Sequence, residues 1–409
     1  MQAYKKKGFW VGVSLFFLFN LLPPPSGLSE AGWIVASVTV LMAAWWATEA
    51  VPVAVTALLP LILFPLLGVT DIKTTALPYA NPNVYLFMGG FILALGIEAS
   101  GLHKRLALQM LVLVGSSGAK LVGGFMLVSA LISMWVMNTS TTLLLLPIGL
   151  AVCASVASSI PNMGASERKS FEVALLLGIA YAATIGGMST LVGTAPNIIF
   201  AGFMQETYNI EISFIDWMKL GVPLSSLMLI ASWYALTKIV YPVKFEATIK
   251  TKAKLQSMLD DLGALTKDEK KVLCIFILAA LAWMFRKLIN QIPGFELLTD
   301  AGVGLFIALL FFIIPSSMHK KDLLTWDQAN KLPWGLLVLF GGGLSLAAQI
   351  GSSGLGLWIG EGLSVLQSVP PIILILCVAT LIIFLTELVF RNYFCCGVFN
   401  RQALHKPAI

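Results

Sequence analysis

Long stretches without a charged residue dominate this chain of 409 residues. A helix needs about 20 predominantly apolar residues to cross a bilayer, so each stretch is a candidate span. In chain order they are Gly8–Ser29, Ala31–Thr48, Ala50–Thr70, Thr74–Ile97, Leu121–Ser166, Val173–Gln205, Leu220–Thr237, Val272–Phe285, Ala301–Met318, Leu332–Gly360 and Gly362–Thr386. Only 11% of the residues are charged, against about 25% in soluble domains. The pattern predicts an all-α polytopic membrane protein and excludes a soluble enzyme and a nucleic-acid-binding protein.

Basic residues indicate on which side of the membrane each loop lies, because cytoplasmic loops are rich in lysine and arginine. Three lysines, Lys5 to Lys7, precede the first span, and residues 238–271 hold eight lysines against five acids. We therefore expect a cytoplasmic N-terminus and a main cytoplasmic loop at 238–271. Arg286 and Lys287 would then lie outside, against the rule.

Two apolar regions carry polar interruptions. Residues 119–160 contain Asn138-Thr139-Ser140-Thr141-Thr142 in their middle and have basic flanks at both ends, which predicts a re-entrant hairpin entering from the cytoplasm. Residues 172–205 are interrupted at Gly186-Gly187 and at Gly193-Thr194-Ala195-Pro196-Asn197, which predicts a broken helix. Non-helical backbone at membrane depth is tolerated only where it is buried in protein or lines a cavity, and such features point to the binding site of a transporter.

An internal repeat appears at an offset of 253 residues. Leu86–Ala94 returns as Leu339–Ala347, and Ser100-Gly101-Leu102 returns as Ser353-Gly354-Leu355. The number of crossings between the copies is odd, so the repeat is predicted to be inverted, with a substrate site at the interface of its halves. The expected organisation is scaffold spans in 1–82, a first repeat in 83–237, a cytoplasmic loop in 238–271, an incomplete second repeat in 272–387 and an aberrant tail in 388–409.

Uncharged oxygen atoms gather at both interruptions, on Ser133, Asn138 and Thr139 and on Gly193 and Thr194. Such oxygens suit a weakly held monovalent cation, whereas amide N–H groups, hydroxyls and helix N-termini suit an anion. The alternative interpretation is that these side chains only join packed helices. The glycines at 89, 90, 186 and 187 are interpreted as helix-packing contacts. Three scattered histidines argue against an intramembrane enzyme or a metal centre.

Four motifs together resemble the divalent anion/sodium symporter family, which includes sodium-coupled di- and tricarboxylate and sulfate transporters related to INDY. They are Ala44–Pro52, Ser133–Thr139, Gly193–Asn197 and Trp334–Gly343. The resemblance covers the chain from Gly8 to Glu387. It implies an inverted repeat with two re-entrant hairpins and a homodimer of scaffold and transport domains that works by an elevator-type motion.

The resemblance also implies roles for individual residues. Substrate contacts fall on Asn138, Thr139 and Thr194, and a first sodium site falls on Ser133, Asn138 and Gly193. Met137 stands where the family has a serine, which removes one hydroxyl from that site. For the second sodium site only Thr386 matches, because Val389-Phe390-Arg391-Asn392 does not carry the family signature.

The expected function is sodium-coupled symport of a C4-dicarboxylate such as succinate, malate or fumarate across the inner membrane, with Na⁺ as the coupling ion. Two alternatives stay open, a transporter of sulfate or another divalent anion, and a transport-incompetent remnant. The second arises because the family pattern stops after about Glu387, through a frame slip or a true terminus. Sequencing the coding DNA tests the frame slip, which is excluded if no open frame resumes the pattern downstream.

Overall fold

The structure is a computed structural model that describes residues 3–113, 117–160, 163–243, 245, 249–317, 322–362, 369–370 and 372–381. These residues form helices and turns, with one isolated β-bridge between Pro315 and Asp322 and no strand among them. Seven helical segments are long and apolar enough to cross a membrane: Glu30–Thr48, Ile72–Ala99, Asn138–Ser158, Ala165–Gly187, Phe214–Val240, Lys267–Ile289 and Trp334–Ser352. The prediction of an all-α polytopic membrane protein is confirmed.

The chain divides into two compact units, the first of which joins the N-terminal residues up to Ala76 with the segment that starts at Ser345. Its helices are α1 (Ala3–Leu21), α2 (Glu30–Thr48), α3 (Val53–Thr56), α4 (Leu59–Leu66), α5 (Ile72–Ala76), the end of α17 (Trp334–Ser352), α18 (Leu355–Gly362) and a helix at Ile372–Leu381. Aromatic side chains join α1 to α2, since Phe9 stacks on Trp45 at 5.1 Å between ring centroids. Ser29 Oγ, at the start of α2, donates a hydrogen bond of 2.9 Å to Ser353 O.

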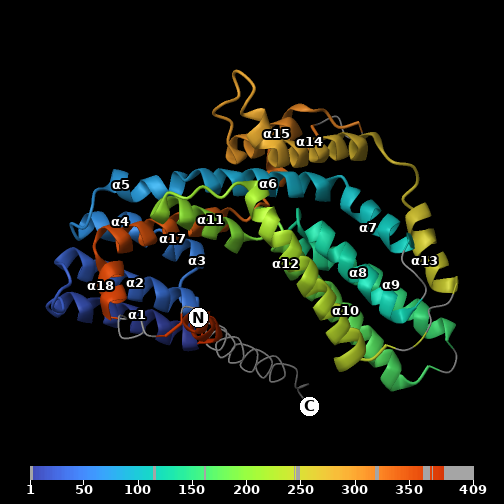
Figure 1. The fold of residues 1–409 in the computed structure, drawn as a ribbon, viewed down its shortest axis with the longest axis horizontal. Coiled ribbons are helices and arrows are strands. Elements are labelled where there is room, and N and C mark those ends of the chain that lie inside the picture. The colour runs from blue at the N-terminus through green and yellow to red at the C-terminus, as the bar shows by residue number, and fades with distance from the viewer. Residues whose placement is uncertain are drawn as a thin grey trace, which may run out of the picture. The chain divides into compact units, whose positions relative to one another are not determined.

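The second unit runs from Leu77 to Leu344 and contains every described residue of the predicted site. Its elements are η1 (Leu77–Ala80), α6 (Pro82–Ala99), α7 (Leu102–Leu113), α8 (Gly118–Ser133), α9 (Asn138–Ser159), α10 (Ala165–Gly187), α11 (Ala195–Tyr208), α12 (Phe214–Tyr234), η2 (Ala235–Val240), α13 (Ile249–Asp260), α14 (Lys267–Ile289), α15 (Asp300–Ile313), α16 (Trp326–Ala329) and the start of α17. Helices α8, α9 and α10 lie side by side, and α12 runs along them (Figure 1).

Glycines set the closest helix contacts in this unit. A β-carbon on Gly89 of α6 would stand 2.5 Å from the backbone of Gly304 in α15. Likewise, a β-carbon on Gly186 of α10 would overlap the backbone of Ala130 in α8. Neither neighbour can move aside like a flexible side chain, so these positions require glycine. The expectation that Gly89 and Gly186 are packing residues agrees with these contacts.

A buried arginine ties α7 to the turn before α14. Arg105 Nε donates to Glu269 Oε1 at 2.8 Å, and both side chains are 6% exposed. Its remaining nitrogens donate to the carbonyls of Leu262, Gly263 and Ala264. A buried charge is tolerated when it is paired and fully hydrogen-bonded, as here. The lysine-rich segment 238–271 is therefore an ordered part of the unit around α13, where the structure describes it.

The local backbone repeats at the offset found in the sequence. Adding 253 to the last residue of α6, Ala99, gives Ser352, which ends α17. The same shift relates Gly101 (φ +76°) to Gly354 (φ +81°), two left-handed glycines that precede α7 and α18. The inverted relation of the two copies stays a prediction, as do the domain boundaries.

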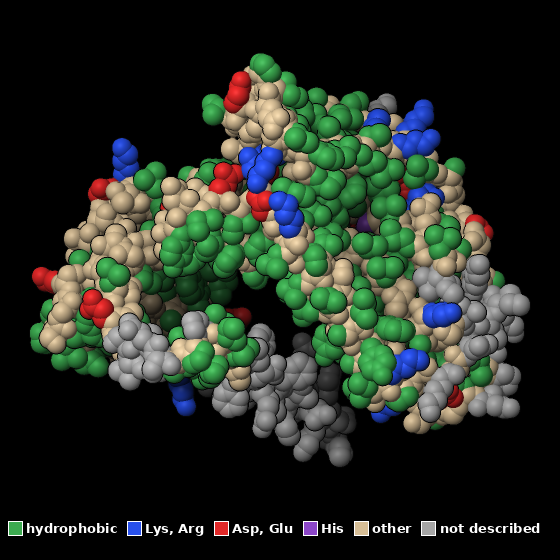
Figure 2. Space-filling view, viewed as in Figure 1, with side chains coloured by type: hydrophobic (Ala, Val, Ile, Leu, Met, Phe, Trp, Pro, Cys, Tyr) green, Lys and Arg blue, Asp and Glu red, His purple; other side chains and the backbone are tan. Residues whose placement is uncertain are grey.

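The surface of these helices is largely apolar. In Figure 2 hydrophobic side chains cover much of the visible face, while charged side chains form small scattered groups. On α12 the exposed apolar side chains include Leu220, Leu227 and Ile230, each more than 60% exposed. Such a surface fits a lipid environment, because an aqueous one disfavours large contiguous apolar patches.

Candidate functional site

The first interruption is a tight turn between α8 and α9. Helix α8 ends at Ser133, and α9 begins at Asn138 after four residues. Ser133 Oγ donates a hydrogen bond of 2.7 Å to Asn138 Oδ1 across this turn. The Ser133 side chain is fully buried and Asn138 is half-buried, so a serine at the end of one helix fixes the amide at the start of the next.

The second interruption separates α10, which ends at Gly187, from α11, which begins at Ala195. Pro196 lies in the first turn of α11, where proline is favoured because its missing N–H would have no helical partner. Asn197 is buried and spans the break, since its Nδ2 donates to Gly187 O at 2.9 Å and to Thr190 O at 2.7 Å. The Gly193 N–H donates to Thr190 Oγ1 at 3.1 Å, which closes the turn.

The two interruptions meet at Gly187. A β-carbon placed on Gly187 would stand 2.5 Å from Asn138 Oδ1 and 3.2 Å from Gly193 O, so both oxygens lie near one point. Thr190 Oγ1 donates to Met134 O at 2.5 Å and joins the break to the hairpin turn. The structure thus brings together Ser133, Asn138 and Gly193, which the sequence predicted as a sodium site.

The remaining predicted site residues lie beside this junction or outside the residues that the structure describes. Thr139 follows Asn138 and is exposed, and Thr194 follows Gly193 and is half-buried. Both side chains are therefore accessible at the edge of the junction. Thr386, predicted for the second sodium site, and the tail at 388–409 lie outside the described residues.

Four helix ends converge here with opposite polarity. The C-terminal ends of α8 and α10 present carbonyl oxygens and partial negative charge, while the N-termini of α9 and α11 present N–H groups and partial positive charge. Met137 and Thr194, at the N-cap positions of α9 and α11, make no side-chain cap. By contrast α2, α12 and α14 are capped by Ser29, Ser213 and Thr266. Uncapped N–H groups at a helix N-terminus suit an anion. The first turn of α11 offers fewer of them than that of α9, because Pro196 has no N–H and Asn197 N donates to Thr194 O at 3.3 Å.

Helix α12 supports the broken helix from outside. Trp217 Nε1 donates to Met188 O at 2.9 Å, and Gly221 faces the carbonyls of Met188 and Ser189 with no room for a β-carbon. Sequence reasoning missed Thr190, Asn197 and Trp217 as parts of this site. Only Asn197 carried a signal, because it belongs to the Gly193–Asn197 motif.

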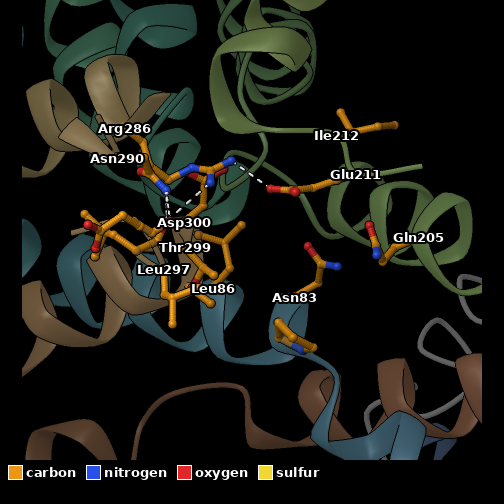
Figure 3. Close-up of a pocket in the computed structure, with 14 residues that line it drawn as sticks. Asn83, Leu86, Gln205, Glu211, Ile212, Arg286, Asn290, Leu297, Thr299 and Asp300 are labelled. Carbon is orange, nitrogen blue, oxygen red and sulfur yellow. Dashed lines mark hydrogen bonds and ion pairs between the residues drawn. The ribbon is translucent and has the colours of Figure 1, made fainter. Parts of the chain in front are cut away.

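Two cavities are lined by none of the residues predicted for the site, although the second borders the hairpin turn at Trp135 and Val136. One of about 380 Å³, drawn in Figure 3, is lined by Pro82, Asn83, Leu86, Gln205, Glu211, Ile212, Arg286, Asn290, Glu296, Leu297, Leu298, Thr299, Asp300 and Ala301. The other, of about 220 Å³, is mainly apolar and is lined by Ile97, Leu102, His103, Leu106, Met110, Leu131, Ile132, Trp135, Val136 and Phe276. Neither contains Ser133, Asn138 or Gly193.

The basic pair that broke the charge rule in the sequence is neutralised in the structure. Arg286 pairs with Asp300 at 2.6 Å and with Glu211 at 2.8 Å, and it points toward both in Figure 3. Lys287 pairs with Asp216 at 2.7 Å. The charge rule counts lysines and arginines rather than net charge, so the pair stays an exception to the predicted orientation.

The sequence-family profile described as "sodium:sulfate symporter transmembrane region" matches residues 6–397. The chain belongs to this family. The sodium-dependent dicarboxylate transporter SdcS of Staphylococcus saprophyticus is 38% identical over 387 residues, which cover 93% of this chain and 74% of that relative. SdcS of Staphylococcus aureus (strain USA300) is 38% identical over 373 residues, 90% of this chain and 72% of the relative. The resemblance seen in the motifs is confirmed, and the family is one of membrane transporters rather than enzymes.

Proposed function

We propose that the chain carries out sodium-coupled symport of a C4-dicarboxylate such as succinate, malate or fumarate, with Na⁺ as the coupling ion. The observation that supports this most is the convergence of carbonyl-bearing and N–H-bearing helix ends at Gly187. Relatives at 38% identity are named sodium-dependent dicarboxylate transporters, which agrees with such a site.

The cation half of the proposal rests on uncharged oxygens. Asn138 Oδ1 and Gly193 O approach one point, with Ser133 Oγ hydrogen-bonded to the first of them. The C-terminal ends of α8 and α10 add partial negative charge without a carboxylate. An ion held by neutral oxygens binds weakly enough to be released, which transport requires. The family has a serine hydroxyl where this chain has Met137, so one side-chain oxygen is missing from the site. We therefore expect sodium binding here to depend more on backbone oxygens.

The anion half rests on the first turns of α9 and α11. Their backbone N–H groups lack side-chain caps, and the hydroxyls of Thr139 and Thr194 lie next to them. A carboxylate at such helix N-termini gains hydrogen bonds and a favourable dipole without a lysine or arginine. The charge of a bound sodium ion nearby would add to this attraction, which couples the two ligands.

Further parts of the proposal follow from the family resemblance. We propose a homodimer in the inner membrane with a cytoplasmic N-terminus, residues 119–160 as a re-entrant hairpin, residues 172–205 as a broken helix, and an elevator-type motion. Substrate contacts are assigned to Asn138, Thr139 and Thr194, and the first sodium site to Ser133, Asn138 and Gly193. Thr386 is assigned to a second sodium site.

Uptake by the purified 409-residue chain in proteoliposomes tests the function directly. We expect labelled succinate to accumulate under an inward sodium gradient and not under a matched choline gradient. Excess malate or fumarate should compete with it. If sulfate competes and is itself accumulated while succinate is not, the divalent-anion alternative replaces the dicarboxylate. Absence of any sodium-driven uptake would contradict symport and support the remnant alternative.

The two halves of the site make separable predictions. Thr194→Val keeps the shape of the side chain and removes the hydroxyl at the start of α11. We expect the succinate concentration for half-maximal binding to rise about fivefold to tenfold, equivalent to about 1–1.4 kcal/mol, a typical contribution of one hydrogen bond. The sodium requirement should change less.

Asn138→Ala, in contrast, should weaken the binding of sodium and of succinate together, because it removes an ion-facing oxygen. Binding titrations of both ligands measure this, and the reverse ranking for Thr194→Val would refute its role.

A further inference from the structure

Trp135 lies in the hairpin turn, two residues after Ser133, and is surrounded by aromatic rings from other helices. Its ring is 5.7 Å from that of Phe214 and 6.3 Å from that of Trp283, both nearly parallel to it. Phe276 meets it edge-on at 5.0 Å. Phe214 begins α12, and the other two rings come from α14. We call Phe214, Phe276 and Trp283 the aromatic clamp.

A single carboxyl residue fixes two rings of the clamp. Asp300 Oδ2 accepts the backbone N–H of Phe214 at 2.8 Å, and Asp300 O accepts Trp283 Nε1 at 2.9 Å. These rings are fully buried and stack on each other at 5.0 Å, with 9° between their planes. The Asp300 carboxylate is in turn paired with Arg286 at 2.6 Å (Figure 3). The clamp is therefore rigidly held from the α15 side.

Trp135 is also connected to the proposed ion site through its neighbours in the chain. Its neighbour Met134 accepts the hydrogen bond from Thr190, the residue whose backbone carbonyl is held by Asn197. The backbone hydrogen bonds of this turn run to the two helices that it joins, to Ala130 and Ile132 at the end of α8 and to Thr141 in the first turn of α9. Binding sites need their groups held to within about 0.5 Å, so a short turn between two helices needs an external anchor.

From these contacts we propose that Trp135 is a positioning residue of the sodium site: the aromatic clamp, ordered by Asp300, holds Trp135 and thereby sets the positions of Ser133 and Asn138. The inference rests on the proposed function, because it concerns the same site. It assigns no ligand contact to Trp135. It predicts that the clamp controls sodium affinity from α12, α14 and α15, whose residues were not among those predicted for the site.

The test compares two tryptophans near opposite ends of α8. Trp233 of α12 donates from Nε1 to Ala119 O near the start of α8 and, like Trp135, is half-buried. The purified 409-residue chain and its variants Trp135→Leu, Trp135→Phe and Trp233→Leu are unfolded thermally at increasing NaCl, with choline chloride keeping the ionic strength constant. The readout is the sodium concentration that gives half of the maximal stabilisation, because a ligand that binds the folded state raises its stability.

For Trp135→Leu we expect this sodium concentration to rise at least fivefold. Trp135→Phe, which keeps a ring in the clamp, should recover most of the loss. Trp233→Leu should lower the melting temperature in choline and leave the sodium concentration unchanged. The inference is overturned if the sodium concentration is unchanged in Trp135→Leu, or if it rises equally in Trp233→Leu. In either case a sodium response of the wild-type chain still upholds the proposed site. A wild-type chain without any sodium response would instead overturn the proposed site and this inference with it.

A second pair of variants covers the case in which Trp135→Leu does not fold. Asp300→Ala removes the acceptor for the Phe214 N–H, whereas Asp300→Asn keeps an oxygen at that place. We expect the sodium concentration for half-maximal stabilisation to rise at least threefold in Asp300→Ala and to rise less in Asp300→Asn. If this sodium concentration is the same in both variants as in the wild type, the clamp does not control the site.

Discussion

Gly187→Ala is expected to weaken sodium binding strongly while the protein still folds. The added β-carbon would stand 2.5 Å from Asn138 Oδ1 and 3.2 Å from Gly193 O. The first distance lies well inside van der Waals contact, and the atoms concerned are a short amide and a backbone carbonyl, so the oxygens themselves must move. Overpacking of this kind costs about 1–3 kcal/mol of stability. Because the displaced atoms are the proposed ligands, we expect sodium affinity to fall at least about tenfold, or ~1.4 kcal/mol.

Gly149→Ala is the matched control for this change. Gly149 is also a helical glycine, in α9. The nearest atom to a β-carbon there would be the terminal carbon Cδ1 of Ile179, at 3.1 Å, followed by side-chain ends of Leu175 and Leu176 at 3.8 Å. A flexible side-chain end can yield by a few tenths of an ångström. Sodium-dependent melting of both variants and of the wild type gives the comparison. Wild-type sodium dependence in Gly187→Ala would show that the oxygens around Gly187 do not form the ion site.

The sequence identified the elements that make the site because their signals are local. Apolar length marked the spans such as α2 and α10, and the proline and glycines of Gly193–Asn197 marked the break before α11. Both are properties of a few consecutive residues. Bounds were less accurate at the first span, where α1 begins at Ala3 and includes all three lysines, and ends at Leu21 before Pro23.

The residue patterns alone did not show which segments meet, and only the family resemblance put Ser133, Asn138 and Gly193 in one site. Gly187 was interpreted as a packing glycine, and its place between Asn138 and Gly193 follows only from the way α10 crosses the hairpin turn. The same holds for Thr190, whose hydroxyl reaches Met134, 56 residues earlier in the chain. The sequence likewise did not show that Arg286 pairs with Asp300 and Glu211. Tertiary contacts of this kind leave no periodic pattern in the sequence.

Asn197→Ala is expected to weaken sodium binding about as strongly as Gly187→Ala, for a different reason. The buried Asn197 amide, in the first turn of α11, holds the carbonyl of Gly187 at the end of α10 at 2.9 Å and that of Thr190 within the break at 2.7 Å. Without it the Gly187 carbonyl loses the Asn197 donor, and Thr190 O keeps only the longer bond of 3.4 Å from the Gly193 N–H. An unsatisfied buried group costs about 1–3 kcal/mol unless it reorients. Reorientation would turn the last carbonyl of α10 away from its present direction. We therefore expect a lower melting temperature in choline and at least a tenfold rise in the sodium concentration for half-maximal stabilisation.

Asn290→Ala separates this effect from a general loss of hydrogen bonds. The Asn290 amide makes the same pair of bonds, to the carbonyls of Glu296 and Leu298 at 2.8 and 3.0 Å, in the turn between α14 and α15. Both variants remove one amide that donates to two backbone carbonyls. The bonds of Asn290 are more exposed than those of the buried Asn197, so Asn290→Ala should lower the stability in choline by the smaller amount. Only Asn197→Ala should change the sodium dependence of melting, because only its carbonyls belong to the break beside Asn138. Equal sodium dependence in the two variants would mean that the geometry of the break does not determine ion affinity.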